Sequence, residues 1–290
     1  MALPEGLLEK VQAAYPNLTN SEKLIARYLI DAPEEFALSS ARRTADAVGV
    51  SEASVTRFAY ALGFSGFSQL RERLQKELMQ RSNRGFKDLL DASYRSATGN
   101  APHLFDFLRE DMELLERSMR KLSLDAFERA VQAILQADTI TVAGSRRARG
   151  LAVILAITLN NIRGNTQLAS MYSGELADEI QRLRPDGLLI AFAFARYVRE
   201  TVLMVRLAAQ KGVPTIVITD SPLSPPAQPA HIVLTVETQH RAHRLSYVAA
   251  LSVANALAST VAYRSWEHSA RYASASEELF RDTETFWSRL

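Results

Sequence analysis

Five short apolar runs in the second half of the chain alternate with segments of helical pattern, and this alternation constrains the fold most. The runs hold Val, Ile, Leu and Ala on consecutive positions, as do strands buried on both faces of a parallel sheet. They cover residues 138–144, 166–170, 186–194, 214–220 and 231–236, with helical patterns at about 147–163, 174–183 and 198–211. The pattern predicts a doubly wound α/β domain with a parallel five-stranded sheet, closed by long C-terminal helices.

Two arginine-rich loops are predicted to meet at one edge of this sheet. In doubly wound folds a ligand binds at the carboxyl ends of the strands, where the strand order reverses, which in a flavodoxin-like order is between the first and third strands. The loop after each of these strands opens a helix, whose N-terminus favours an anion, and arginines add charge-assisted contacts. The candidate effector-binding residues are Gly144, Ser145, Arg146 and Arg147 in the first loop, then Phe194, Ala195, Arg196, Tyr197 and Glu200 in and after the second. The alternative is that the arginines are only solvated loop residues.

Residues 44–64, TADAVGVSEASVTRFAYALGF, have the pattern of two helices joined by a three-residue turn. Gly49 suits the turn, Ser51 is placed to cap the second helix, and Gly63 follows that helix where a left-handed residue is favoured. Apolar residues at i, i+3, i+4 and i+7 form one buried stripe on the second helix: Val55, Phe58, Ala59 and Leu62. The segment is typical of a helix-turn-helix unit, and a plain helical hairpin is the alternative.

The face of the second helix opposite that stripe is suited to the major groove of DNA. At about 100° per residue, Ala53, Arg57 and Tyr60 share this face, with Ser54 and Thr56 at its edges. Residues 36–87 hold nine basic side chains against four acidic ones, which favours a polyanionic partner. The candidate DNA-binding residues are Arg42, Arg43, Ser51, Ala53, Ser54, Thr56, Arg57 and Tyr60.

The chain of 290 residues is long enough for two domains. Its first 80 residues contain helical patterns only, among them a capping box from Thr19 to Glu22 and a helix from about 67 to 79. Breakers then gather in a stretch that we expect to be a joint. The predicted organisation is a helix-turn-helix domain at 1–81, a linker at 82–103 and an effector-binding and oligomerisation domain at 104–290, which a long helix enters.

Composition narrows the classes of function. The chain has no cysteine, which excludes disulfides and thiolate metal sites and fits a cytoplasmic protein. Its N-terminus lacks the pattern of a signal peptide, and the most apolar stretch, 247–263, carries Ser252, Asn255 and Ser259 on one side, so no membrane segment is expected. The five histidines lack the spacing of metal ligands. We therefore expect neither a metal nor a cofactor.

The chain resembles the RpiR-type family of bacterial transcription regulators over nearly its whole length. The matching runs are LTNSEKLIARYLIDAPEEF and VSEASVTRFAYALGFSGFSQL in the N-terminal half, then ITVAGSRRARGLA, RETVLMVRLAAQKGVPTIVITDSPLSPPA and HIVLTV. The resemblance implies an N-terminal helix-turn-helix domain and a C-terminal sugar-isomerase (SIS) domain. It also implies double-stranded operator DNA as partner, a small metabolite as effector, and repression more than activation.

The predicted effector loops depart from the family's pattern. Sugar-phosphate-binding members usually place serines or threonines in these loops, whereas this chain has Arg146, Arg147 and Ala148 after Ser145, and its third strand ends in Ala193, Phe194 and Ala195. Arginine keeps affinity for an anion while changing reach and geometry. The expected effector is therefore anionic, either a carboxylated metabolite or a phosphosugar that binds in another pose.

Three functions remain open on the sequence. The first is a regulator, not an enzyme, that works as a homodimer or homotetramer; a crowd of alanines in the helix expected from about 240 to 263 would allow close packing either between subunits or within the domain. The second is a sugar-phosphate isomerase, for which the candidate acids and bases are Glu175, Glu200, His240 and His243. The third is a regulator whose SIS domain serves only to form the oligomer.

Overall fold

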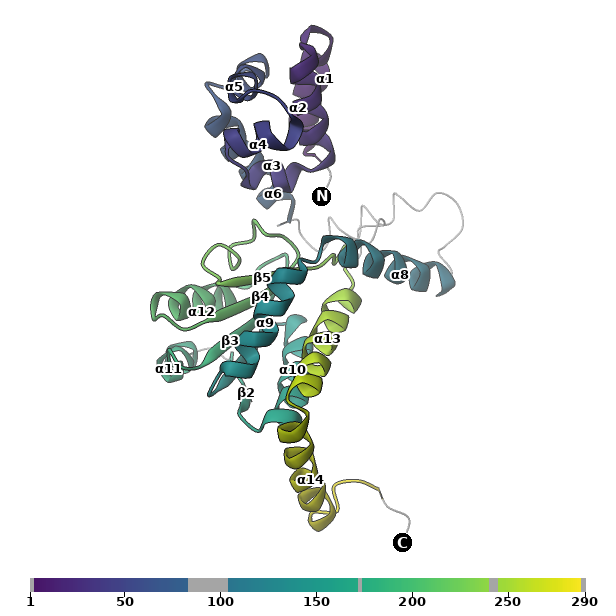
Figure 1. Cartoon of the computed structure of the whole chain (residues 1–290), viewed down its shortest axis with the longest axis vertical. Coiled ribbons are helices and arrows are strands. Elements are labelled where there is room, and N and C mark those ends of the chain that lie inside the picture. Colours follow the sequence, from purple (N-terminus) through teal and green to yellow (C-terminus); the bar gives the residue numbers. More distant parts are fainter. Residues whose placement is uncertain (1–2, 83–103, 172–173, 240–244, 288–290) are drawn as a thin grey trace. The chain divides into compact units, whose positions relative to one another are not determined.

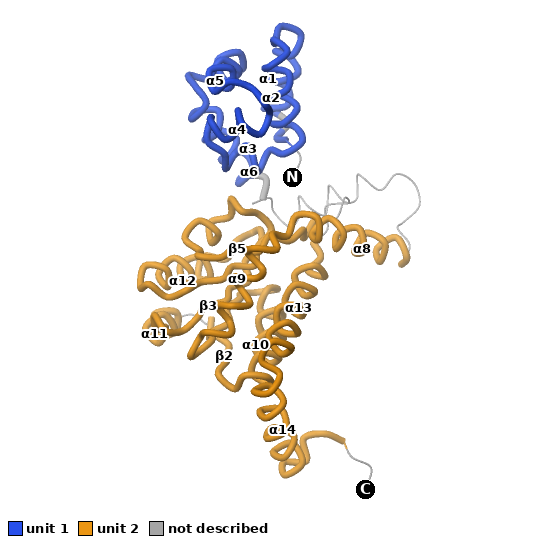
Figure 2. Tube along the Cα trace, viewed as in Figure 1, with its two compact units in different colours: residues 1–84 blue, residues 85–290 orange. Residues whose placement is uncertain are grey.

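The computed structural model describes residues 3–82, 104–171, 174–239 and 245–287. Contacts between Cα atoms divide the chain into two compact units, residues 1–84 and 85–290 (Figure 2). Most of the expected linker, 82–103, lies outside the described residues, so its boundaries stay a prediction.

Unit 1 is all-helical in its described part, as the sequence predicts. Its elements are α1 (Glu5–Ala14), the 3₁₀ turn η1 (Tyr15–Asn17), α2 (Asn20–Asp31), α3 (Pro33–Leu38), α4 (Ala41–Val48), α5 (Glu52–Ala61) and α6 (Phe67–Ser82). The capping box at the start of α2 is confirmed: Thr19 N–H donates to the Glu22 carboxylate, and Glu22 N–H donates to the Thr19 hydroxyl. The expected stripe of α5 is also confirmed, because Val55, Phe58 and Ala59 are fully buried.

Unit 2 contains the predicted parallel sheet with strand order β2-β1-β3-β4-β5. All strand pairs are parallel, and β1 pairs with both β2 and β3. The strands are β1 (Ile140–Gly144), β2 (Thr166–Leu168), β3 (Leu188–Ala193), β4 (Thr215–Thr219) and β5 (Ile232–Thr235). The helices are α8 (Leu104–Lys121), α9 (Leu124–Gln136), α10 (Ala148–Arg163), α11 (Leu176–Arg182), α12 (Arg199–Gln210), α13 (Val248–Arg264) and α14 (Trp266–Asp282). The expected reversal of strand order between the first and third strands is confirmed.

Helices cover both faces of the sheet (Figure 1). Buried side chains of α9, α10 and α13 share one apolar cluster with Val142, Ile190 and Phe192 of the strands. On the other face α12 packs against Ala143, Ala191 and their neighbours, with α11 at the margin. The strand order reverses between β1 and β3, and this place is here called the switch point. Helix α10 follows β1 and α12 follows β3, so the two helices leave the switch point on opposite faces of the sheet.

Helix α13 starts later than its sequence prediction, and its packing decides between the two alternatives left open for its alanines. It begins at Val248 and not near residue 240, because Ser246 N–H donates to Thr238 O and the Ser246 hydroxyl accepts from Val248 N–H. Most of its alanines are buried within the domain: Ala249, Ala250, Ala254 and Ala258 are at most 2% exposed. These four alanines are therefore part of the domain's own core, and a contact between subunits must use other residues.

Helix α8 leaves exposed most of the apolar side chains that recur along it at three- and four-residue spacing. Leu114 and Ser118 are buried, whereas Leu104, Leu108, Met112 and Met119 are exposed. Helix α9 had no counterpart among the sequence predictions. Within the described residues, no helix is both long and apolar enough to cross a membrane.

Candidate DNA-reading helix and effector site

The helix-turn-helix of unit 1 has the local geometry that its sequence dictates. Gly49 closes α4 with φ of 74°, and Gly63 follows α5 with φ of 82°, so both occupy the left-handed region that glycine tolerates best. The Ser51 hydroxyl accepts a hydrogen bond from Ser54 N–H at 3.2 Å and caps α5. The predicted roles of Gly49, Ser51 and Gly63 in this backbone are thus confirmed.

The exposed face of α5 carries Ala53, Arg57 and Tyr60, as expected. Thr56 is half-buried, and its hydroxyl donates to Glu52 O at 3.3 Å. Arg42 and Arg43 of α4 are exposed. The arrangement leaves a cation and a large aromatic ring accessible on the reading helix.

Ser54 does not lie on the edge of that face, contrary to its sequence prediction. It is only 6% exposed, because its hydroxyl lies 2.8 Å from the Ser51 hydroxyl and turns back toward the N-terminus of α5. Arg57 Nη2 donates to the same Ser54 oxygen at 3.0 Å. Ser54 therefore holds the Arg57 guanidinium in place and has no open surface of its own for a base.

At the switch point of unit 2, β1 ends in a tight approach to α10. A Cβ on Gly144 would lie 2.7 Å from Ala148 O, so only glycine lets the helix start this close to the strand. The Ser145 hydroxyl forms a hydrogen bond of 2.9 Å with the hydroxyl of Thr201, a buried residue of α12. This bond joins the predicted first loop to the helix that follows the second.

The N-terminus of α10 differs from the expected open anion site. The N–H groups of Ala148, Arg149 and Gly150 donate to carbonyls of Ser145, Arg146 and Arg147, which form the turn in front of the helix. These amides are consequently occupied by the chain itself. Arg146 has φ of 53°, and the side chains of both Arg146 and Arg147 are exposed.

Arg147 is directed toward the start of α13. Its Nη2 donates to Leu245 O at 3.2 Å, and its guanidinium carbon lies 5.0 Å from the centre of the Tyr247 ring. The other predicted loop meets the same ring, because Phe194 stacks on Tyr247 at 4.8 Å between centroids. Tyr247 thereby connects the two predicted loops, although it was absent from the predicted site.

The loop after β3 is fixed by Asp220, which directly follows β4. The Asp220 carboxylate accepts from Ala195 N–H at 3.2 Å and from the Tyr197 hydroxyl at 2.9 Å. Burial raises the pKa of the Asp220 carboxyl above its ordinary value, even though these hydrogen bonds and one from Thr219 oppose the shift. The predicted residues Arg196 and Glu200 are exposed, and no side chain caps α12 at its N-terminus.

Sequence reasoning missed Asp220, yet a signal for it was present. The residue follows the fourth strand, whose carboxyl end lies beside that of the third strand, so the rule that located the other loops also applies to it. Tyr247 carried no such signal, because its place beside Phe194 depends on where α13 begins.

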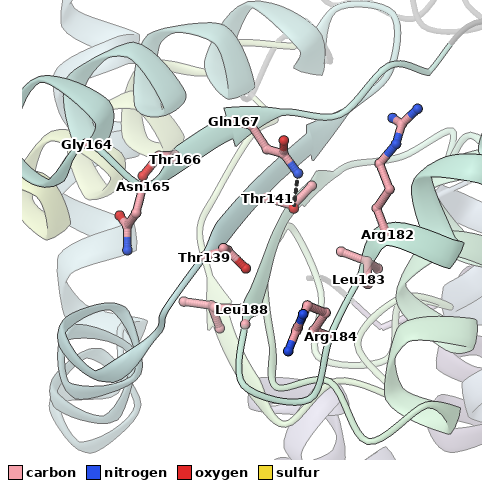
Figure 3. Close-up of a pocket in the computed structure, with 11 residues that line it drawn as sticks. Thr139, Thr141, Gly164, Asn165, Thr166, Gln167, Arg182, Leu183, Arg184 and Leu188 are labelled. Atoms are coloured by element: carbon pink, nitrogen blue, oxygen red, sulfur yellow. Dashed lines mark hydrogen bonds between the residues drawn. The ribbon is translucent and has the colours of Figure 1, made fainter.

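A cavity of about 290 Å³ lies at the opposite, amino ends of the strands (Figure 3). Arg182 and Arg184 border it, and each pairs with a carboxylate, of Glu179 and Asp186 respectively. Gln167 donates to the Thr141 hydroxyl across the sheet at 3.2 Å. This cavity includes none of the predicted effector residues.

Of the four residues named for an isomerase, the structure describes Glu175 and Glu200, which lie at the starts of different helices. Glu175 lies at the start of α11 and accepts a hydrogen bond from the Ser170 hydroxyl, whereas Glu200 is on α12. His240 and His243 lie outside the described residues. Nowhere in the described ranges do three or more His, Cys, Asp or Glu side chains form a group that could hold a metal ion.

Comparison with known proteins agrees with this architecture. Residues 5–81 match the helix-turn-helix domain of the rpiR family, and residues 133–260 match the SIS domain. The crystal structure of the sugar isomerase domain of an RpiR transcription factor from Sphaerobacter thermophilus is 34% identical, with a TM-score of 0.56, over 59% of this chain and 96% of that one. The chain belongs to the RpiR family of transcription regulators.

Two further relatives extend the match beyond the SIS domain. An uncharacterized HTH-type transcriptional regulator of Haemophilus influenzae is 26% identical over 237 residues, 81% of either chain. The NanR protein of Vibrio vulnificus, solved in complex with ManNAc-6P, is 17% identical with a TM-score of 0.52, over 96% of this chain and 98% of that one. At that identity the second likeness supports the fold alone. The chain is thus a transcription regulator with a helix-turn-helix and a SIS domain.

Proposed function

We propose that this regulator reads operator DNA through α5 and senses an anionic sugar derivative, a phosphosugar or a sugar acid, at the carboxyl ends of β1, β3 and β4. The observation that carries the proposal is the position of exposed arginines in both parts: Arg57 on the reading helix, and Arg146 and Arg196 in the loops at the switch point. That a protein of the same fold is complexed with ManNAc-6P supports a phosphosugar.

On DNA, Arg57 is suited to a guanine, because its planar guanidinium can donate two hydrogen bonds to O6 and N7 in the major groove. Tyr60, 56% exposed, offers a ring face to a neighbouring thymine methyl. Arg42 and Arg43 of α4 are assigned to phosphates, which position the helix without reading sequence. Ser51 and Ser54 support this contact from within the protein.

In the proposed effector site, we assign to arginine the anion-binding role that serine and threonine hydroxyls usually have in this family. The Ser145 hydroxyl is bonded to the Thr201 hydroxyl, and Asp220, which holds the loop after β3, offers a carboxylate and no hydroxyl. Arg146 and Arg196 are exposed and remain for the anion, while Arg147 is within the same loop but held by neutral partners. Binding of the anion would change the affinity of the regulator for operator DNA. We expect the affinity to fall, so that the operator is released.

A second copy of the chain is the proposed partner of α8. Four exposed apolar side chains, Leu104, Leu108, Met112 and Met119, recur along this helix, and reading two half-sites of an operator requires a dimer. Light scattering of the full chain should show a dimer, and Met112→Glu should shift it toward monomer. The matched change Leu279→Glu on α14, also exposed, should leave the mass unchanged; a wild-type monomer at micromolar concentration would contradict the proposal.

The function itself is tested by two measurements on the full chain. Selection from a random pool of duplex DNA should return a motif with two related half-sites. A thermal-shift screen of phosphosugars and sugar acids should identify a stabilising anion, since a ligand at 100 times its dissociation constant adds about 2.7 kcal/mol. An unselective DNA profile would refute the reading role, and stabilisation by uncharged sugars alone would refute the anion site.

A further inference from the structure

The connection between β5 and α13 touches both the effector loops and α8. Its described parts are residues 236–239 and 245–247, here called the connector. Helix α8 is the first described helix after residue 82, so among the described helices of unit 2 it lies nearest in sequence to the DNA-reading unit. The connector therefore lies between the proposed effector loops and α8.

On the effector side, the connector is held by both switch-point loops. Arg147 donates to Leu245 O and lies over the Tyr247 ring, and Phe194 stacks on that ring. Arg147 thus has two neutral partners in the connector, a carbonyl oxygen and the face of an aromatic ring. The loop that is proposed to receive the anion is also the loop that fixes residues 245–247.

The two halves of the connector are bonded to each other. Ser246 N–H donates to Thr238 O at 2.8 Å, and Gln239 and Leu245 form an antiparallel bridge. Thr238 is buried, and Val236 N–H donates to Thr219 O beside Asp220. A displacement at Leu245 or Tyr247 is consequently passed to residues 236–239.

On the other side, residues 237–239 are bonded to the last two turns of α8. Glu237 N–H donates to the Ser118 hydroxyl at 2.8 Å, and this hydroxyl in turn donates to Leu114 O. The Glu237 carboxylate pairs with Lys121 at 2.5 Å, and Arg117 Nη2 donates to Gln239 O at 3.3 Å. Three residues in the last two turns of α8, Arg117, Ser118 and Lys121, are thereby bonded to the connector.

We propose that Arg147 and the connector form the route by which the effector site controls α8, and through it the DNA-reading unit. The proposal rests on the proposed function for the identity of the effector, an anion at the switch point. When that anion draws Arg147 away, Leu245 and Tyr247 lose a partner, the pairing of 237–239 with 245–246 loosens, and the C-terminal turns of α8 lose their restraint.

Physical chemistry favours this exchange of partners. Charge-assisted hydrogen bonds of a guanidinium to phosphate or carboxylate are roughly twice as strong as neutral ones. Arg147 gives up only a neutral carbonyl and a ring face, so an anion within reach competes with both. A ligand shifts an equilibrium only by its differential affinity for the two states, and here that difference arises at Arg147.

The test uses amide hydrogen exchange in the full-length chain without any ligand. Arg147→Ala removes the contact that the anion would remove, and should speed exchange of the Ser246, Glu237 and Leu122 amides about tenfold, equivalent to about 1.4 kcal/mol. Leu122 N–H donates to Ser118 O in the last turn of α8 and therefore reports on the helix. The matched control is Arg206→Ala, which removes an exposed arginine from α12 and should leave these three amides unchanged.

A second variant tests the route from the opposite end, because coupling between two sites is reciprocal. Ser118→Ala removes the acceptor of Glu237 N–H and should speed exchange of the Ser246 amide. If Arg147→Ala changes Ser246 but not Glu237 and Leu122, or Ser118→Ala leaves Ser246 unchanged, the connector does not transmit. Ligand binding plays no part in this experiment, so the proposal and the proposed function can fail separately.

Discussion

The reading helix and the effector loops are both built around arginines, but their supports differ in range along the chain. Arg57 is held by Ser54, and Ser54 by Ser51, each three residues apart on one turn of α5. In the effector loops, Ser145 bonds a residue 56 positions away, Tyr197 one 23 away and Arg147 one 98 away. A local support makes a surface whose geometry survives changes elsewhere, whereas distant supports make a site that responds to the packing of several elements. This difference suits a DNA-reading helix whose geometry stays constant and proposed effector loops whose conformation changes.

The largest expected effect separates the cores of the two units. Phe58→Ala should destabilise unit 1 by about 3–5 kcal/mol, because a fully buried aromatic ring is removed from its centre. Phe192→Ala, equally buried in β3, is the matched change in unit 2. In calorimetry of the full chain, each variant should lower the temperature of a different unfolding transition. A single transition whose temperature falls equally in both variants would contradict independent cores.

The next effect concerns the local support of Arg57. Arg57→Ala should weaken binding to the selected operator by about 1–3 kcal/mol and relax the preference at one base pair of each half-site. Ser54→Ala should do the same to a smaller extent, about 0.5–1.5 kcal/mol, because it removes only the hydrogen bond that holds the guanidinium.

The contrast for these variants is a phosphate contact. Arg42→Ala and Arg43→Ala should weaken binding to all sequences alike and reduce the salt slope by about one each. Gel-shift titrations at several salt concentrations measure both quantities. If Ser54→Ala leaves both affinity and preference intact, Arg57 does not need its local support.

The smallest effect tests a distant support in the effector site. Burial raises the pKa of Asp220, so the folded state favours its neutral form: the stability this gives is fully present below the unfolded value of about 3.9 and is lost as the pH rises through the folded value. Asp220→Asn removes the charge and keeps one of the two acceptor oxygens. The melting temperature of this variant, relative to that of the wild type, should be higher at neutral pH than in acid. A difference in melting temperature that is constant across pH would show that the charge is irrelevant.

Sequence reasoning reached those parts of the molecule that short-range rules determine. The cap at Ser51, the left-handed Gly49, the buried stripe of α5 and the order of strands all follow from spacing within one or two elements. The same spacing failed for Ser54, because a short polar side chain at the start of a helix can turn inward to its own cap. Spacing alone also does not show that Leu104, Leu108, Met112 and Met119 of α8 are exposed, since which side of a helix is buried depends on what packs against it.

The sequence predicted the strand ends that form the candidate effector site, but not the contacts between them. The switch-point rule placed the two predicted loops at neighbouring strand ends, whereas their partners Thr201, Asp220 and Tyr247 come from α12, the end of β4 and the start of α13. These contacts require the relative placement of whole elements, which no local pattern contains. Whether Arg146, Arg147 and Arg196 bind the effector stays a prediction.

The central claim is that an anion at the switch point changes DNA affinity through Arg147. The most direct measurement titrates the anion found in the thermal-shift screen against the complex of the full chain with its selected operator, for the wild type and for Arg147→Ala. The account predicts a change in operator affinity of about 5- to 150-fold in the wild type, and little change in the variant at a ligand concentration that saturates it. A ligand that saturates the wild type and leaves its operator affinity unaltered, or that alters it equally in Arg147→Ala, would contradict the account.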